Sequence, residues 1–125
     1  QSAVSGGERS RVMLAIKKIM AENNDLPTLI LDEIDTGVSG RIAEEMGKLM
    51  QEMSQDLQLI VITHLAQVAA KGNENYKVVK FDENAVTKTT IVKLSDAEKL
   101  NEIAQLISGS KITEAAISQA KELIG

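Results

Sequence analysis

Several residue types and patterns are missing from this sequence. Its 125 residues include no cysteine, which excludes a disulfide framework and fits an intracellular protein. No apolar run approaches the roughly 18 residues of a membrane span, and no signal-peptide pattern is present. A net charge of −4 gives none of the basic character that marks a nucleic-acid-binding segment.

The low aromatic content limits how a core can be built. Aromatic residues make up 2% of the chain, whereas hydrophobic residues make up 43%. A core must therefore consist of Ile, Leu, Val, Ala and Met. The length fits one domain or part of one. We expect an acidic, soluble, intracellular α/β segment.

Residues 28–33 combine an apolar run with two carboxylates. Residues 28–31 are apolar or β-branched and follow Pro27, which predicts a short strand buried on both faces. Asp32 and Glu33 stand where that strand should end, and ligands of open parallel sheets bind outside the carboxyl ends of the strands. There, Asp can hold Mg²⁺ through a water and Glu can activate an attacking water. The alternative is a strand that runs out into a solvated acidic loop.

Apolar patterns around this stretch predict a βαβ unit. An earlier helix carries one apolar stripe, made of Val12, Met13, Ile16, Ile19 and Met20. A later amphipathic helix has a buried side made of Ile42, Met46, Leu49, Met50 and Met53. Residues 59–63 form a second fully apolar strand. Strand, helix and strand at this spacing predict a right-handed crossover between parallel strands.

The second half of the chain predicts a short helix, a hairpin and two further helices. The short helix covers residues 64–71 and ends at Gly72. Residues 76–81 and 86–94 flank a turn and predict an antiparallel hairpin. Ser95 and Glu98 have the spacing of a capping box that opens the next helix, which Gly109 ends. The last helix has one apolar face, made of Ala116, Ala120, Leu123 and Ile124.

A glycine-containing motif opens the first helix. Ser5 and Glu8 have capping-box spacing, with Ser5 as the N-cap. Gly6 and Gly7 would let the backbone approach a ligand closely, and the free N–H groups of a helix start attract anions. The alternative is an ordinary capped helix.

His64 is the only histidine, and it follows the second apolar strand. The βαβ geometry places it at the same end of the sheet as Glu33. An imidazole there could hydrogen-bond a phosphate oxygen or the attacking water, although a lone histidine is more often structural. Residues 35–40 contain two glycines and a serine before a helix. They form either a plain turn with Ser39 as N-cap or a contact loop beside the carboxylates.

The order and spacing of these motifs resemble one part of an ABC-type ATPase head. Residues 4–8 are similar to the signature motif and residues 28–33 to the Walker B strand. Residues 35–40 are similar to the D-loop, and Thr63 with His64 to the H-loop. Four motifs in register are far more specific than any one of them.

Within this superfamily the chain resembles RecN, a family of bacterial DNA repair proteins with SMC-like ATPase heads. The resemblance spans nearly the whole chain and is carried by residues 5–17, 31–40, 62–70, 102–109 and 120–123. Ile34 stands where transport ATPases usually have proline. Gln105 and Arg9 depart from the residues common in many relatives, and neither touches the proposed chemistry.

The resemblance implies a fold and a division of the chain. The fold would be α/β, as in the C-terminal half-domain of a P-loop NTPase-like ABC ATPase, with a mainly parallel sheet and flanking helices. Residues 1–72 would form the core with the signature, Walker B and H-loop motifs. Residues 73–94 would form a β-hairpin, and residues 95–125 the C-terminal helices.

The resemblance also implies site residues and cofactors. Two heads would sandwich two ATP molecules. Asp32 would help hold Mg²⁺, Glu33 would position or activate the hydrolytic water, and His64 would contact the γ-phosphate. The residues implied to contact nucleotide from the opposite head are Ser5, Gly6, Gly7 and Glu8. Those implied to communicate between the two sites are Asp35, Gly37, Ser39 and Gly40.

The chain contains no G-x-x-x-x-G-K-[ST], so nothing in it supplies the phosphate-cradling loop or its lysine. We therefore expect a fragment of a larger ATPase that is inactive alone, with the other half of its head upstream. The uncovered strand edge and apolar surface predict self-association of the fragment.

The implied function is recombinational repair of DNA double-strand breaks in the bacterial cytoplasm, in association with the nucleoid. DNA would be contacted through the intact protein. Two alternatives stay open. One is the head of another SMC-like ATPase, such as a RecF-like or UvrA-like protein, although the zinc-binding cysteines of UvrA are absent from this segment. The other is a non-catalytic interaction module with the same fold.

Overall fold

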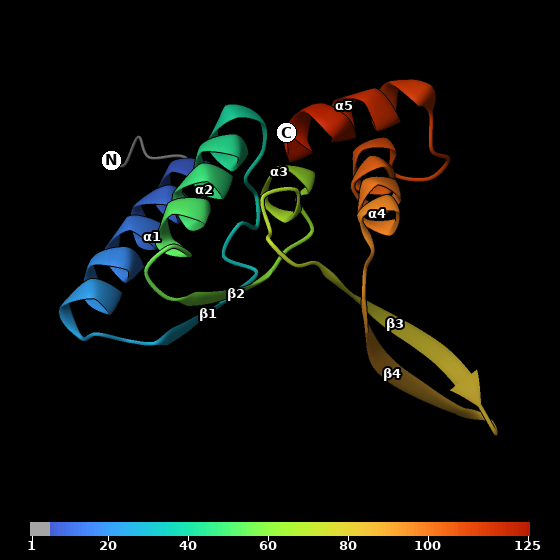
Figure 1. Cartoon of the computed structure of the whole chain (residues 1–125), viewed down its shortest axis with the longest axis horizontal. Helices are drawn as coiled ribbons and strands as arrows, with labels where there is room; N and C mark the ends of the chain where they lie inside the picture. Colours follow the sequence, from blue (N-terminus) through green and yellow to red (C-terminus); the bar gives the residue numbers. More distant parts are fainter. Residues whose placement is uncertain (1–5) are drawn as a thin grey trace. The chain divides into compact units, whose positions relative to one another are not determined.

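The computed structural model of the chain describes residues 6–125, which divide into two units (Figure 1). The first unit, Gln1–Lys71, contains α1 (Gly6–Asn23), β1 (Thr28–Asp32), α2 (Gly40–Met53), β2 (Gln58–Ile62) and α3 (Ala66–Ala69). The second unit, Gly72–Gly125, contains β3 (Tyr76–Glu83), β4 (Val86–Lys93), α4 (Asp96–Ser108) and α5 (Glu114–Ile124). None of the described helices is both long and apolar enough to span a membrane.

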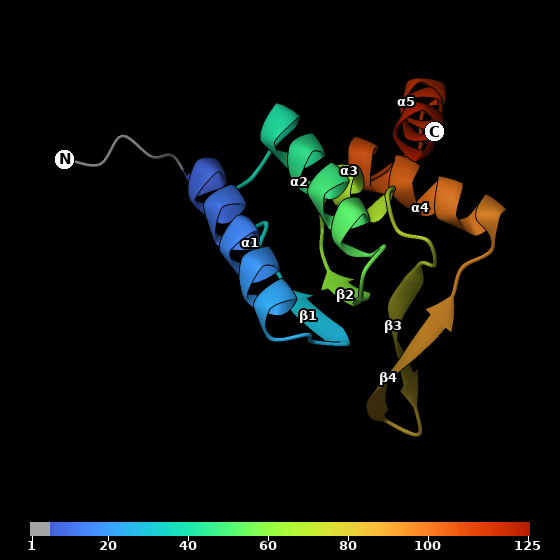
Figure 2. The ribbon, with the colours of Figure 1, turned by 60° about the vertical axis from the view of Figure 1, so that its left-hand side comes forward.

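The first unit contains the predicted βαβ arrangement. Strands β1 and β2 pair in parallel, in a register that runs from Thr28 opposite Gln58 to Asp32 opposite Ile62. Helix α2 connects them, and both α1 and α2 lie on the same side of the two strands (Figures 1 and 2). The predicted pairing of parallel strands is confirmed, and the handedness of the crossover stays a prediction.

The core of the first unit lies between the two strands and their helices. It is aliphatic and rich in methionine, and its buried members are Leu14, Leu31, Val38, Ala43, Met46, Met50, Met53 and Val68. The predicted buried side of α2 is confirmed, because Met46, Met50 and Met53 are buried. Ile42 and Leu49 are partly buried against the same cluster.

The prediction that the strand of residues 28–31 is buried on both faces is wrong, and the second apolar strand is likewise exposed on one face. Leu31 is buried, whereas Ile30 is 62% exposed, and Ile60 and Ile62 are 43% and 47% exposed. The cause is the one-sided cover of the sheet, since α1 and α2 lie on the same side of it (Figure 2). We call the uncovered side, formed by Ile30, Ile60 and Ile62, the open sheet face.

The apolar stripe predicted on the first helix is also exposed. All five of its members, Val12, Met13, Ile16, Ile19 and Met20, are exposed. Helix α1 instead buries Leu14 and Ala21, which lie two turns apart on another side of the helix. The stripe is therefore a second apolar surface that the described residues leave open.

Helices α2 and α3 approach each other closely at Gly47. A Cβ atom added at Gly47 would lie 2.7 Å from the carbonyl oxygen of Gln67, closer than such atoms approach in proteins. Helix α3 covers only Ala66–Ala69, which is shorter than the predicted 64–71. The residues before α3 are therefore free to form the loop that carries His64.

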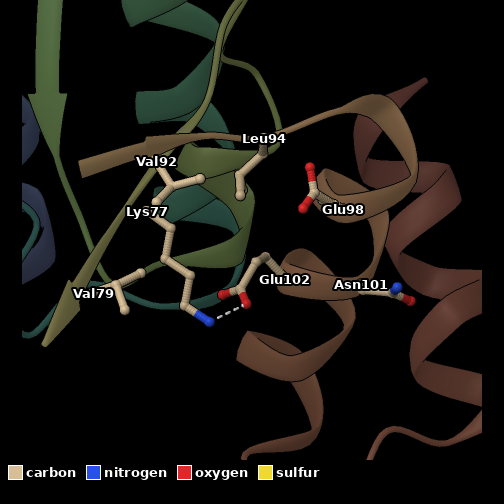
Figure 3. Close-up of a pocket in the computed structure, with 7 residues that line it drawn as sticks. All are labelled: Lys77, Val79, Val92, Leu94, Glu98, Asn101 and Glu102. Carbon is tan, nitrogen blue, oxygen red and sulfur yellow. Dashed lines mark hydrogen bonds and ion pairs between the residues drawn. The ribbon is translucent and has the colours of Figure 1, made fainter. Parts of the chain in front are cut away.

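The second unit is built on the predicted hairpin. Strands β3 and β4 pair antiparallel, with Glu83 opposite Val86. The two-residue turn, Asn84 and Ala85, has positive φ angles of 52° and 64°, which is the geometry of a type I′ turn. A groove of about 250 Å³ lies between this hairpin and α4 (Figure 3). There Lys77 Nζ donates to Glu102 Oε1 over 2.5 Å.

Helix α4 begins and ends as the sequence predicts. Ser95 and Glu98 form a full capping box, with Ser95 N donating to Glu98 Oε1 at 2.8 Å and Glu98 N donating to Ser95 Oγ at 3.2 Å. Helix α4 ends at Gly109, whose φ of 84° is readily adopted by glycine. The buried residues of the two helices are Ile103, Ala104, Ala116 and Ala120.

The capping box gives this unit a testable pH dependence. Hydrogen bonds from the Ser95 backbone N–H, and secondly from its side chain, lower the pKa of Glu98. A carboxyl whose pKa is lowered by folding stabilises the fold above its unfolded pKa, and this stabilisation is lost as the pH falls through the folded value. We therefore expect Glu98→Gln to reduce the loss of stability on acidification below about pH 4.3, the usual Glu pKa.

Urea unfolding at neutral and acid pH, followed by circular dichroism, measures this effect. Glu114→Gln is the matched control, because Glu114 also lies in the first turn of a helix and loses the same charge. An equal change in pH dependence for both variants would contradict the role of the capping box.

Candidate functional site

The carboxyl ends of β1 and β2 bring two predicted site residues into contact. Asp32 pairs with Ile62 in the parallel register, so the loops after the two strands leave the sheet side by side. His64 Nε2 lies 2.9 Å from Glu33 Oε1, which is hydrogen-bonding distance. The two side chains are 82% and 52% exposed, so both can be reached from solvent. The prediction that they share one end of the sheet is confirmed.

The backbone of Glu33 is held in an unusual conformation. Its φ angle is 51°, in the left-handed region, which costs a residue with a Cβ atom roughly 1–2 kcal/mol. Two hydrogen bonds fix it there. The Glu33 N–H donates to the Ile62 carbonyl at 3.0 Å, and Thr36 Oγ1 donates to the Glu33 carbonyl at 2.9 Å. Strained residues of this kind persist only where the surrounding structure holds them, and they cluster at functional sites.

Asp35 differs from its neighbours because its side chain is inside the protein. It is 4% exposed and is the one buried charged residue in the described part of the chain. Its Oδ2 accepts a hydrogen bond from the Thr63 hydroxyl. Asp35 thus joins the loop after β1 to the loop after β2. Its role in communication between the two nucleotide sites stays a prediction.

The two glycines and the serine of this loop lie at the surface. Gly37 and Gly40 have positive φ angles of 78° and 58°, and both are exposed. Ser39 occupies the N-cap position of α2, but its side chain makes no capping hydrogen bond. Val38 is buried in the core and its N–H donates to the Asp35 carbonyl at 3.1 Å. The loop is therefore anchored at Val38, while its glycines and serine face solvent.

The glycine motif is described only in part. Gly6, Gly7 and Glu8 form the first turn of α1, whereas Ser5 and its predicted capping role lie outside the described residues. A Cβ added at Gly6 would meet nothing within 4 Å. A Cβ added at Gly7 would lie 3.4 Å from Ile42. The space around Gly6 is compatible with a close ligand, and the role of this motif stays a prediction.

The carboxylate set fits a partial magnesium site. Asp32 is exposed at the end of β1, and the described residues contain no group of three or more metal-binding side chains. Mg²⁺ is commonly held by one or two carboxylates, with waters and substrate phosphates completing its shell. Asp32 can therefore supply one ligand to a site that other groups complete.

No separate role was predicted for Thr63, which was placed with His64 in the motif similar to the H-loop. It stands directly before His64, at the end of an apolar strand. In the structure its hydroxyl donates to Asp35 and its Oγ1 accepts from the Leu65 N–H at 3.0 Å. A polar residue directly after an apolar strand was the available signal, but its partner, 28 residues away in the sequence, could not be identified from the local pattern.

Comparison with known proteins agrees with this arrangement. The chain is 42% identical over 120 residues to the DNA repair protein RecN of Haemophilus influenzae, and the match covers 96% of this chain. RecN of Bacillus subtilis is likewise 42% identical over 120 residues. This chain is a relative of RecN. It spans 22% of the first of these RecN proteins and 21% of the second, and no protein-family model matches it.

Solved structures place this RecN relative in the fold of SMC ATPase heads. The SMC head domain from Thermotoga maritima matches with a TM-score of 0.64 and 32% identity, over 74% of this chain and 34% of that one. A chain from a study of ATP-driven dimerization and DNA-stimulated activation of SMC ATPases matches with a TM-score of 0.65. Its identity is 24%, and the match covers 84% of this chain and 63% of that chain, so it supports the fold alone. The predicted α/β fold is confirmed.

Proposed function

We propose that this chain forms part of the ATP-binding and ATP-hydrolysing head of a RecN-like protein that acts in recombinational repair of DNA double-strand breaks. The observation that carries the proposal is the contact between Glu33 and His64 at the carboxyl ends of two parallel strands. Ligands of such sheets bind at this edge. The similarity to RecN supplies the biological setting.

Each side chain at this edge of the sheet would have a separate role in ATP hydrolysis. Glu33 would orient the attacking water and accept its proton, since an exposed carboxylate can act as a general base. His64 would direct the Glu33 carboxylate and donate to a phosphate oxygen. Asp32 would hold Mg²⁺, which neutralises charge on the phosphates when it is bound. ATP would supply the phosphoryl group that water attacks.

The site needs further residues from elsewhere in the protein. The chain has no phosphate-cradling loop of the G-x-x-x-x-G-K-[ST] type. It also spans 22% of the H. influenzae RecN it resembles. We therefore propose that the remainder of the head supplies this loop, and that the chain alone does not hydrolyse ATP.

A second head is the proposed partner of the glycine motif. One solved structure with this fold comes from a study of ATP-driven dimerization of SMC ATPases. Another is an SMC head bound to the C-winged helix domain of ScpA. By analogy, Ser5, Gly6, Gly7 and Glu8 would contact a nucleotide held by the opposite head. DNA would be contacted by other parts of the intact protein, in the bacterial cytoplasm and nucleoid.

The open sheet face would be covered by the remainder of the head in the longer protein. In the chain alone, burial of this face between copies would remove apolar surface from water, so we expect self-association. Light scattering over a range of concentrations measures it. Replacing Ile30 and Ile60 by threonine keeps the preference for strand and should shift the chain toward monomer.

Ile91→Thr is the matched control for this test. Ile91 is similarly exposed but lies on β4 in the second unit, so its replacement should leave self-association unchanged. A wild-type chain that stays monomeric at high concentration would contradict the role given to the open sheet face.

Hydrolysis itself is tested in a longer protein. The matching segment of the Bacillus subtilis RecN is replaced by this chain, and ATP binding and hydrolysis are measured on the chimera. We expect Glu33→Gln to lower the hydrolysis rate by about 10²–10⁴-fold, the usual effect of losing a general base, with ATP binding retained.

Glu22→Gln is the matched control, because Glu22 is an exposed glutamate of α1 that forms an ion pair with Lys18. It should leave hydrolysis unchanged. Hydrolysis that survives Glu33→Gln would remove the proposed base from the mechanism.

A further inference from the structure

We propose that Asp35 and Thr63 form a positioning pair that holds Glu33 and His64 together. Neither residue of the pair would touch the reacting atoms. The inference rests on the proposed function for the catalytic role of the Glu33–His64 contact. The positions of the two loops, however, are a property of the chain itself and can be measured without nucleotide.

The first support for the pair is the burial of Asp35. A carboxylate that is 4% exposed is costly unless a hydrogen bond satisfies it. The Thr63 hydroxyl donates that bond to Asp35. The hydroxyl oxygen of Thr63 in turn accepts a hydrogen bond from the Leu65 N–H at 3.0 Å. The hydroxyl is therefore oriented by the backbone on one side and by the carboxylate on the other.

The second support is the position of the pair in the chain. Asp35 lies two residues after Glu33, and Thr63 directly precedes His64. A bond between Asp35 and Thr63 therefore fixes both loops next to the functional side chains. The loop of Asp35 is anchored further by Val38, whose N–H donates to the Asp35 carbonyl and whose side chain is buried in the core.

The third support is that the Glu33–His64 contact is too weak to fix the positions of the two loops by itself. The two side chains are mostly exposed to solvent, and exposed pairs contribute little to the stability of an arrangement. Their separation of 2.9 Å therefore has to be set by the loops that carry them. The partly buried hydrogen bond between Thr63 and Asp35 joins these two loops, next to the bond from the Glu33 N–H to the Ile62 carbonyl.

The single histidine makes the proposal measurable in the 125-residue chain. The imidazole nitrogen resonances of His64 are the only ones of their kind, so they need no assignment by comparison. When no other residue is replaced, Glu33→Gln should change the chemical shifts of these nitrogens, because the hydrogen-bond partner of His64 Nε2 is altered. The size of that change reports how closely the two loops are held.

Thr63→Val keeps the shape and strand preference of threonine but removes the hydroxyl. We expect it to abolish most of the response of His64 to Glu33→Gln. Thr63→Ser, which keeps the hydroxyl, should retain the response, and so should Asp35→Asn, whose amide oxygen can still accept from Thr63. A residue with a merely structural role would change the stability of the first unit without changing this response.

Two results would overturn the proposal. One is a Thr63→Val chain that folds, as judged by its amide spectrum, and keeps the full response. The other is measured on the wild type and needs no variant to fold. The Thr63 hydroxyl proton should be protected from exchange because it is donated to a buried carboxylate, and free exchange would exclude the pair.

The outcome is separable from that of the proposed function. Loss of ATP hydrolysis in the chimera tests the role of Glu33, whereas the His64 response tests the geometry without nucleotide. If the chimera fails to hydrolyse ATP while the response behaves as expected, the positioning pair stands and the assigned reaction falls.

Discussion

The parallel pairing of β1 with β2 is the constraint on which the rest of the first unit depends. Its register places Asp32 opposite Ile62, so the loops that follow the two strands begin side by side. The Glu33 N–H continues the pairing by donating to the Ile62 carbonyl. The contacts of Glu33 with His64 and of Asp35 with Thr63 both follow from this register. A slip of one residue in this register would separate both pairs. It would also move the apolar side chains of the slipped strand to the opposite face of the sheet.

Local signals in the sequence were sufficient for most elements and for part of the site. The two strands, the hairpin and the capping box at Ser95 each depend on residues close in the chain, and all were predicted. The meeting of Glu33 and His64 was also predictable, because parallel strands bring their carboxyl ends together. The Asp35–Thr63 bond was not, since it joins residues 28 apart whose types are common in loops.

The errors concern burial, which local pattern does not determine. Ile30 was predicted to be buried because it belongs to a continuous apolar run, and Ile60 stands in a second such run. Such runs indicate a strand with cover on both faces, but they do not say which part of a protein provides the cover. The same holds for the exposed stripe of α1, which includes Ile16 and Ile19. Both surfaces fit a chain that spans about a fifth of its RecN relatives.

The central claim is that this chain contributes one part of a composite nucleotide site. Isothermal titration calorimetry with Mg²⁺-ATP tests it most directly, on the chain alone and on the chain mixed with a Bacillus subtilis RecN from which the matching segment has been deleted. The account predicts a complete site, and therefore heat of binding that depends on Glu33, His64 and Asp32, only in the mixture. Equally tight binding by the chain alone would contradict it, because a phosphate site would then exist within these 125 residues.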